Sequence, residues 1–166
     1  TTVFRKCCAD LYNAAGIPVQ AGGKLRKLYD KRPKDVSQVA YFKKAVLPLF
    51  PPIFHKWFIN TFDEPTSWFE SRLRYSRTLA VMSMVGYVVG LGDRHAENIM
   101  LDSQNGDVIH VDFDCLFERG KNLSVPELVP FRLTNNIVDA LGITGYEGVF
   151  RMCSEKTLFV LRENRV

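Results

Sequence analysis

The hydrophobic spacing of the chain changes at residue 90, and this change limits the folds that the chain can adopt. Before it, small and apolar residues recur every three or four positions, which predicts one face of a long helix. These residues are Leu73, Ser76, Ala80, Met84 and Tyr87. After it, residues 99–102 and 108–113 are short β-prone runs, which predict two strands. A helix must therefore lead into a small sheet through the sequence GLGDRHAEN.

The two predicted strands are separated by Asn105-Gly106, which is one of the strongest two-residue turn signals in a protein sequence. If these two residues form the whole turn, Ile99 pairs with Asp112. The same register puts Asn98 and Asp112 at the same open end of the hairpin. That end lies next to the loop that joins the helix to the first strand.

The rest of the chain is predicted to be mostly helical. Thr2, Ser37 and Ser67 are suitable N-terminal caps, and Ser67 forms a capping box with Glu70. Gly16 predicts a helix end. The helices expected from these signals are residues 2–15, 37–48, 52–58, 67–90, 135–141 and 147–163, and the polar stretch 19–36 is a loop or a short helix. The predicted fold class is mainly α, an α+β helical lobe with a short β-hairpin.

Composition indicates one globular, intracellular domain. The chain is 46% hydrophobic and 24% charged, which excludes disordered and fibrous classes. The longest apolar stretch, 79–91, is about 13 residues, well short of the ~20 that a membrane-spanning helix needs. We see no charged segment followed by an apolar stretch at the start, so we expect an intracellular protein without a secretory signal. The four cysteines form no CxxC pair, so we expect reduced thiols.

Six basic residues are concentrated in one short region of a chain whose net charge is +4. They are Lys24, Arg26, Lys27, Lys31, Arg32 and Lys34. A nucleic-acid patch is one interpretation. We favour a solvated connector between helices, because no aromatic residues are interleaved with the charges.

Three polar residues have the spacing that phosphoryl transfer requires. In protein kinases a base orients the attacking hydroxyl, and an Asn five positions later and a following Asp hold magnesium. Asp93 precedes Asn98 by the same five positions, and Asp112 heads Asp-Phe-Asp where the hairpin returns. Each residue alone has an ordinary structural explanation, as a turn residue, a cap or a strand end. The joint pattern favours a catalytic site.

Neighbouring residues of the same loop leave more than one interpretation open. His95 either contacts the transferring phosphoryl group or braces the loop. We expect Arg94 to be a structural partner for nearby carboxylates and Glu97 to face solvent.

At these residues the chain resembles the phosphatidylinositol-3-kinase-related protein kinases. GLGDRHAENIM and HVDFD look like their catalytic loop and metal-binding motif, and VPELVPFRLT resembles the end of their activation segment. Within the family, PPIFHKWF, TSWFESR, AVMSMVGY and VDFDCLFERGK are most similar to the ATR-type DNA-damage checkpoint kinases. GITGYEGVFRMCSEKT also resembles the ATM type.

The resemblance implies roles and partners beyond what spacing indicates. Asp93 would be the catalytic base and His95 a contact to the γ-phosphate of ATP, while Asn98 and Asp112 would bind Mg²⁺ (or Mn²⁺) and through it the nucleotide. Residues 1–166 would be the C-terminal lobe of the kinase domain, with the catalytic loop at 90–98 and the metal motif and activation segment at 112–132. The parent would phosphorylate Ser/Thr-Gln sites in the nucleus, with an ATRIP-type regulatory partner, with DNA contacted only indirectly and with no membrane.

Two departures from the kinase pattern stand out. Asp114 occupies the position of the glycine in Asp-Phe-Gly, which matters only if φ must be positive there. No Gly-rich loop or strand Lys precedes Asp93, and Gly22-Gly23-Lys24 is too short to supply them. We therefore expect the N-terminal lobe to be missing and the chain to be inactive alone.

Two other functions remain possible at this point. A lipid kinase shares the Asp-Arg-His arrangement, but the activation segment offers only Arg119, Lys121 and Arg132 for a phosphorylated headgroup. A truncated or inactive lobe could serve as a non-catalytic binding module. The intact set of Asp93, Asn98 and Asp112 argues against long-standing loss of activity.

Overall fold

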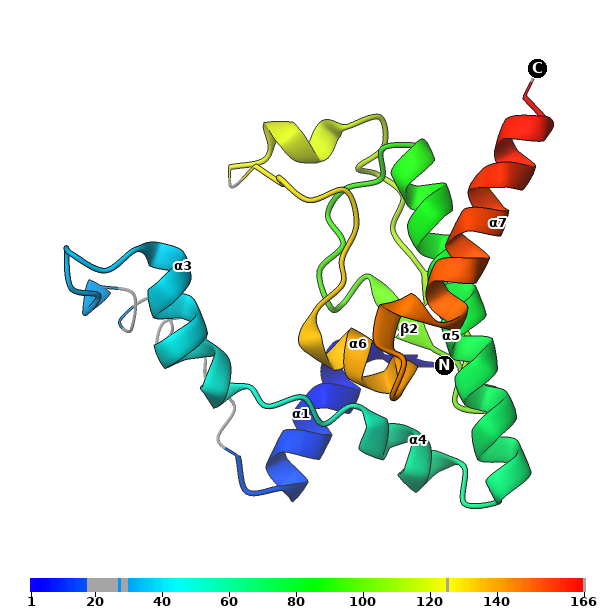
Figure 1. The fold of residues 1–166 in the computed structure, drawn as a ribbon, viewed down its shortest axis with the longest axis horizontal. Helices are drawn as coiled ribbons and strands as arrows, with labels where there is room; N and C mark the ends of the chain where they lie inside the picture. The colour runs from blue at the N-terminus through cyan, green and yellow to red at the C-terminus, as the bar shows by residue number, and fades with distance from the viewer. Residues whose placement is uncertain (18–26, 28–29, 125, 166) are drawn as a thin grey trace.

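The 24-residue helix α5 (Pro65–Val88) runs along one side of the molecule (Figure 1). Packed against it are the sheet and the helices α4 (His55–Thr61), α6 (Asn135–Leu141) and α7 (Val149–Glu163). The computed structural model describes residues 1–17, 27, 30–124 and 126–165. Within them the chain is mainly helical, with one small sheet of three antiparallel strands. The predicted fold class, a helical lobe with a short hairpin, is confirmed.

Helix α5 begins two residues before the predicted cap, Ser67. Pro65 is its first residue, and the side chain of Glu64 accepts a hydrogen bond from the backbone N–H of Ser67 at 2.7 Å. Proline suits this position because its φ is already helical and it has no N–H to satisfy. Gly90, with a φ of 61°, follows the helix end as predicted. None of the described helices has the length and apolar character needed to cross a membrane.

The predicted hairpin is present, but its register differs from the prediction by two residues. Strand β2 (Ile99–Leu101) pairs with β3 (Val108–His110), with Ile99 opposite His110 instead of Asp112. The turn is longer than expected because the Asp102 N–H donates to the Asp107 carbonyl at 2.9 Å, which leaves four residues, 103–106, between them. Side-chain oxygens of Asp102 and Asn105 each accept a backbone N–H two residues later and stabilise this longer turn.

Gly106 should be the most sensitive position of this turn. Its φ is 80°, and a Cβ there would lie 2.7 Å from the Ser71 carbonyl oxygen of α5. We expect Gly106→Ala to destabilise the hairpin by about 2 kcal/mol, from left-handed strain and this close contact together. Gly16→Ala is the matched control, since Gly16 has a φ of 67° and open space around it. Hydrogen exchange of the β2 and β3 amides measures the effect, and equal exchange rates in the two variants would contradict the role of the contact.

The N-terminus contributes a strand that the sequence analysis missed. Residues Thr2–Val3 form β1, which pairs with β2, so Thr2 is not a helix cap. Helix α1 (Phe4–Ala14) starts directly after it and ends before Gly16, as predicted. The Arg5 N–H donates to the Ala96 carbonyl at 3.0 Å, which ties the start of α1 to the loop before β2.

The other helices follow the predicted pattern, with small shifts at their ends. Helix α3 (Gln38–Tyr41) begins after the predicted Ser37 cap and continues as a π-helix, Phe42–Val46, and a 3₁₀ turn, Leu47–Leu49. Helix α6 (Asn135–Leu141) has the predicted ends. Helix α4 spans His55–Thr61, and the 3₁₀ turns span Arg119–Asn122 and Gly145–Glu147. Helix α7 (Val149–Glu163) begins after the second of these turns.

An aromatic cluster holds α1, α4 and α5 together. Phe54 and Phe58 are fully buried, Phe54 meets Phe4 edge-on at 4.7 Å between ring centroids, and Phe58 meets Tyr75 at 5.1 Å. The Tyr75 hydroxyl donates to the Ile137 carbonyl at 3.0 Å, which adds α6 to the cluster. Edge-to-face aromatic pairs favour one arrangement of the helices over others. Helix α5 is thereby fixed near its middle, at Tyr75.

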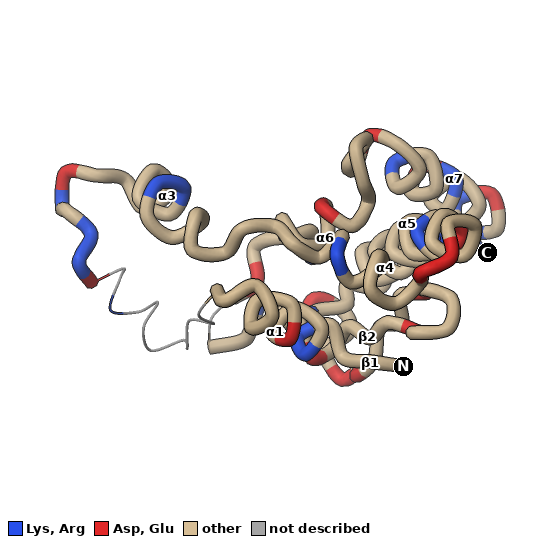
Figure 2. Tube along the Cα trace, turned by 90° about the horizontal axis from the view of Figure 1, so that it is seen from below, with Lys and Arg blue, Asp and Glu red and all other residues tan. Residues whose placement is uncertain are grey.

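Helix α3 and the residues just before it form an arm that extends from the rest of the described chain and carries several Lys and Arg residues (Figure 2). Lys27, Lys31 and Lys34 are exposed, and Arg32 donates to the Val36 carbonyl. Lys24, Arg26 and most of the stretch 19–36 lie outside the described residues. Cys7, Cys8, Cys115 and Cys153 are free thiols.

Candidate active site

The loop after α5 is held from both sides. The Leu91 N–H donates back to the Gly86 carbonyl at 2.8 Å, which closes the end of α5. The segment after β3 then returns alongside the loop, where Gly92 donates to the Cys115 carbonyl at 2.7 Å and Glu118 donates to the Gly90 carbonyl at 2.9 Å. Residues 90–92 therefore lie between α5 and residues 115–118.

Asp93 has a fixed backbone and a free carboxylate. Its φ is 58°, in the left-handed region that non-glycine residues seldom adopt. Its N–H donates to Glu127 Oε2 at 2.9 Å, and its carbonyl accepts the side-chain N–H of Asn98 at 2.9 Å. These two bonds offset the cost of the strained backbone, which is about 1–3 kcal/mol. The carboxylate itself is 44% exposed and open to a reactant.

His95 lies beside this carboxylate, with its Nε2 3.8 Å from Asp93 Oδ2. The backbone N–H of Glu97 donates to His95 Nδ1 at 3.2 Å. In a neutral imidazole the accepting nitrogen carries no proton, so the proton is on Nε2. A hydrogen-bond donor therefore faces the same space as the Asp93 carboxylate. Glu97 is exposed, as predicted, and pairs with Arg5.

Asn98 and Asp112 lie at the same open end of the hairpin despite the shifted register. The Val111 N–H donates to the Asn98 carbonyl at 3.1 Å, so Asp112 is the next residue beyond this pair. Asn98 is 7% exposed, and because its side-chain nitrogen donates to Asp93, its side-chain oxygen remains available as a ligand. Asp112 is exposed and has a φ of 62°.

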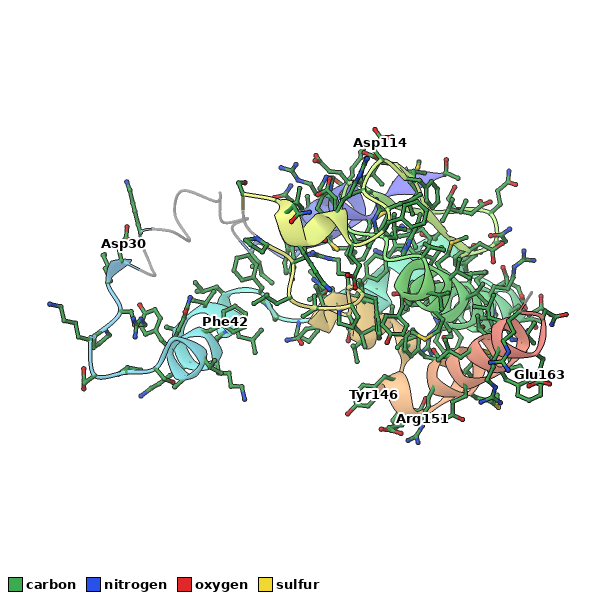
Figure 3. The ribbon with its side chains drawn as sticks, turned by 90° about the horizontal axis from the view of Figure 1, so that it is seen from above. Asp30, Phe42, Asp114, Tyr146, Arg151 and Glu163 are labelled. Carbon is green, nitrogen blue, oxygen red and sulfur yellow. The ribbon has the colours of Figure 1, made fainter. Side chains whose placement is uncertain are left out.

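The aspartate at the glycine position of the motif is accommodated without strain at φ. Asp114 is not among the described residues with a positive φ, whereas Asp112 is. No glycine is needed at residue 114. Figure 3 shows Asp114 at the surface, on the edge of the molecule opposite to Arg151 and Glu163 of α7.

Arg94 is the residue whose role the sequence analysis misjudged. Its side chain is buried and donates to four backbone carbonyls, not to carboxylates. Nε donates to Gly92 at 2.9 Å, Nη1 to Val111 at 2.6 Å and to Asn98 at 3.4 Å, and Nη2 to Asp112. Burial lowers the pKa of Arg94, and the neighbouring Asp112 and Asp93 oppose this effect. The guanidinium joins both halves of the site because its planar fork can serve several acceptors at once.

His110 is the last residue of β3, two positions before Asp112. It is buried, and its Nδ1 has no hydrogen-bond partner among the described residues. Burial, and to a smaller degree the Arg94 guanidinium, lowers the pKa of His110 to about 4. The imidazole is therefore neutral at physiological pH, and it adds no second positive charge beside Arg94.

The oxygen atoms at the open end of the hairpin fit a magnesium ion shared with phosphate. Magnesium prefers hard oxygen ligands and is usually held by one or two protein groups together with water and substrate phosphates. The Asn98 amide oxygen and the Asp112 carboxylate are such groups. Within the described residues, no cluster of three or more His, Cys, Asp or Glu side chains offers a site made of protein ligands alone.

A cavity of about 510 Å³ opens beside the loop, between the end of α5 and residues 118–121 and 126–130. Its wall is largely apolar, with Leu91, Leu128 and Val129 beside two prolines, and it reaches Gly92, the residue before Asp93. Leu128 and Val129 are exposed. An apolar side chain of a bound molecule could therefore lie within a short distance of the Asp93 carboxylate.

A helical lobe in which a long helix leads into such a loop, with a hairpin returning to it, has the fold of a kinase catalytic lobe. The solved structure titled "FAT and kinase domain of CtTel1" superposes on 98% of the chain with a TM-score of 0.84 at 41% identity. The chain belongs to the phosphatidylinositol 3- and 4-kinase family, whose model matches residues 2–166.

Curated relatives refine the assignment within the family. Serine/threonine-protein kinase ATR of Arabidopsis thaliana is 56% identical over 99% of this chain, and protein kinase rad3 of Schizosaccharomyces pombe is 49% identical over 99%. The resemblance to the ATR-type kinases is thereby confirmed. The chain spans 6% of the length of the first relative and 7% of the second, and it covers 12% of the chain in the superposed structure.

Proposed function

We propose that the protein containing this chain is an ATP-dependent serine/threonine protein kinase and that residues 1–166 form the C-terminal lobe of its kinase domain. In this proposal, residues 90–98 are the catalytic loop and residues 112–132 the metal motif and activation segment. The observation that carries it is the common location of Asp93, Asn98 and Asp112 at the open end of the hairpin. The names of the relatives, which are serine/threonine-protein kinases, support the same activity.

Each residue has a role that its contacts suit. The exposed Asp93 carboxylate accepts and orients the attacking hydroxyl while its backbone stays fixed by Asn98 and Glu127. The Nε2–H of His95 donates to the phosphoryl oxygens, where charge develops during transfer. Asn98 and Asp112 would hold Mg²⁺ or Mn²⁺ on the ATP phosphates. When bound, the metal neutralises phosphate charge.

The surroundings of the loop favour a peptide substrate over a phosphoinositide. A phosphorylated headgroup calls for free cations. Lys121 pairs with Glu118 at 2.7 Å, Arg119 donates to the Asp114 carbonyl at 3.3 Å, and Arg132 is largely buried. The apolar cavity beside Gly92 suits a peptide side chain instead.

The finer features of the proposal come from the resemblance to ATR-type kinases. They are phosphorylation of Ser or Thr followed by Gln, a role in the DNA-damage checkpoint, a nuclear location, an ATRIP-type regulatory partner and indirect contact with DNA. Relatives named ATR and rad3 at 56% and 49% identity support them.

The activity can be tested with the full-length protein and three substrates. We expect Mg-ATP-dependent phosphorylation of a Ser-Gln peptide, about tenfold or more weaker phosphorylation of the matched Ser-Ala peptide, and none of phosphatidylinositol vesicles, because the cations near the site are already paired or buried. Labelled ATP measures all three. Phosphorylation of the vesicles in preference to the peptide would reassign the protein as a lipid kinase. Absence of transfer to any of the three would favour a non-catalytic binding module.

A further inference from the structure

We propose that Glu127 is a positioning residue that couples the segment after β3 to the base of the reaction, through the backbone N–H of Asp93. Glu127 lies 34 residues after Asp93, on the far side of the 3₁₀ turn Arg119–Asn122. Its Oε2 accepts the Asp93 N–H at 2.9 Å. This inference rests on the proposed function, because it assumes that Asp93 is the base.

The carboxylate lies in a space that two glycines leave open. A Cβ on Gly92 would lie 2.6 Å from Glu127 Oε2, and a Cβ on Gly120 would lie closer still. The two glycines also approach each other, since the same Cβ on Gly92 would be 2.9 Å from the Gly120 Cα. Side chains at either position would displace the carboxylate from the Asp93 N–H.

The backbone of Glu127 is fixed as well as its side chain. The Glu127 N–H donates to the Gly120 carbonyl at 3.1 Å, and Gly120 itself is buried. The segment is also attached to the loop through Gly92 and Cys115, whose N–H and carbonyl are 2.7 Å apart. The bond from Asp93 to Glu127 therefore depends on residues 115–120 and Glu127 lying against the loop. A change in the fold of the segment after β3 would therefore also move Asp93.

The bond acts on the strained residue of the loop. Asp93 has a φ of 58°, and its N–H direction changes if the residue relaxes to an ordinary conformation. A charged acceptor aimed at that N–H selects the strained form. The Asp93 carboxylate makes no hydrogen bond within the described residues, so its direction depends on the backbone that Glu127 and Asn98 hold.

Three substitutions in the full-length protein separate hydrogen bonding from charge. Glu127→Ala removes the acceptor, Glu127→Asp keeps the charge but is too short to reach, and Glu127→Gln keeps an oxygen at the same distance. We expect kcat for a Ser-Gln peptide to fall about 10- to 100-fold in the Ala and Asp variants, and less than about threefold in the Gln variant. KM for ATP should stay within about twofold in all of them. Glu155→Ala, on the exposed face of α7, is the matched control.

Hydrogen exchange provides a readout that does not depend on activity. In Glu127→Ala the Asp93 amide should exchange about tenfold faster, while amides in α5 and α6 keep their rates. If the wild-type protein phosphorylates no peptide but this local change occurs, the proposed function fails and the coupling stands.

Several results would overturn the positioning role. They are unchanged kcat in Glu127→Ala, a Gln variant as poor as the Ala variant, or a raised peptide KM at constant kcat, which would make Glu127 a substrate contact. Unchanged exchange of the Asp93 amide would overturn it as well.

Discussion

Asp112→Ala in the full-length protein is expected to reduce phosphorylation of a Ser-Gln peptide by about 1,000-fold. The carboxylate would hold the metal that neutralises the phosphates, and the loss of one group that stabilises charge in a transition state costs about 100- to 1,000-fold or more. The fold should be preserved, because Asp112 is exposed and, among the described residues, its side chain accepts a hydrogen bond only from the Asp114 N–H at 3.3 Å. Initial rates at saturating Mg-ATP measure the effect.

Two further variants make this result specific. Alanine tolerates the φ of 62° at this position less well than aspartate does. Asp112→Asn suits the left-handed region and keeps one amide oxygen, so it separates loss of the carboxylate charge from backbone strain. Asp107→Asn is the matched control on the same hairpin, where the carboxylate only pairs with the exposed Arg74. Activity retained in Asp112→Ala would rule out the metal assignment.

The parts of the site that lie close together in sequence were predictable. Asp93 and Asn98 are five residues apart on one loop, and this spacing, together with Asp112, predicted that they belong to one site. The bond between the Asn98 side chain and the Asp93 carbonyl is consistent with this. Asp112 was placed at the correct end of the hairpin, although the predicted register was wrong. A longer turn changes which residues pair across the hairpin, but the second strand still returns in the same direction.

Contacts between distant segments were not predictable from spacing. The Asn105-Gly106 signal specified a turn, but side-chain caps from Asp102 and Asn105 lengthened it. Strand β1 was missed because two residues have no periodicity, and only pairing with β2 defines it. Glu127 was not singled out in the sequence, since its contact with Asp93 spans 34 residues.

Arg94 was misjudged for a related physical reason. Because Arg94 lies near Asp93 and Asp112 in the chain, carboxylates were the expected partners of its guanidinium. The two carboxylates instead face solvent, while the backbone carbonyls of the loop face inward. Buried carbonyls need donors, and few elements of regular structure are available here to supply them. The need to satisfy the backbone therefore determined the partners of Arg94, and residue type alone did not indicate it.

Arg94→Met is expected to have the second largest effect, and it should act on both stability and activity. The substitution removes the Arg94 donor from four backbone carbonyls. The Asn98 carbonyl still accepts the Val111 N–H, and the other three lose their partner. Leaving buried acceptors unpaired costs about 1–3 kcal/mol each, so the three carbonyls left without a donor should destabilise the loop and strand ends by at least about 3 kcal/mol. Peptide phosphorylation should fall at least about 100-fold, because Asp93 and Asp112 lose their common support. Exchange rates of amides 91–98 and 110–113 measure the structural part.

Arg94→Lys separates the geometry of the guanidinium from its charge. A lysine keeps the positive charge but offers a single nitrogen, which cannot serve carbonyls on both sides of the site as the planar fork does. Its activity should therefore lie much closer to that of Arg94→Met than to that of the wild type. Arg74→Lys, at an exposed pair with Asp107 on the far end of the hairpin, should have no measurable effect. A lysine variant with wild-type activity would mean that charge at residue 94 is sufficient, and that the four carbonyl contacts do not determine the geometry of the site.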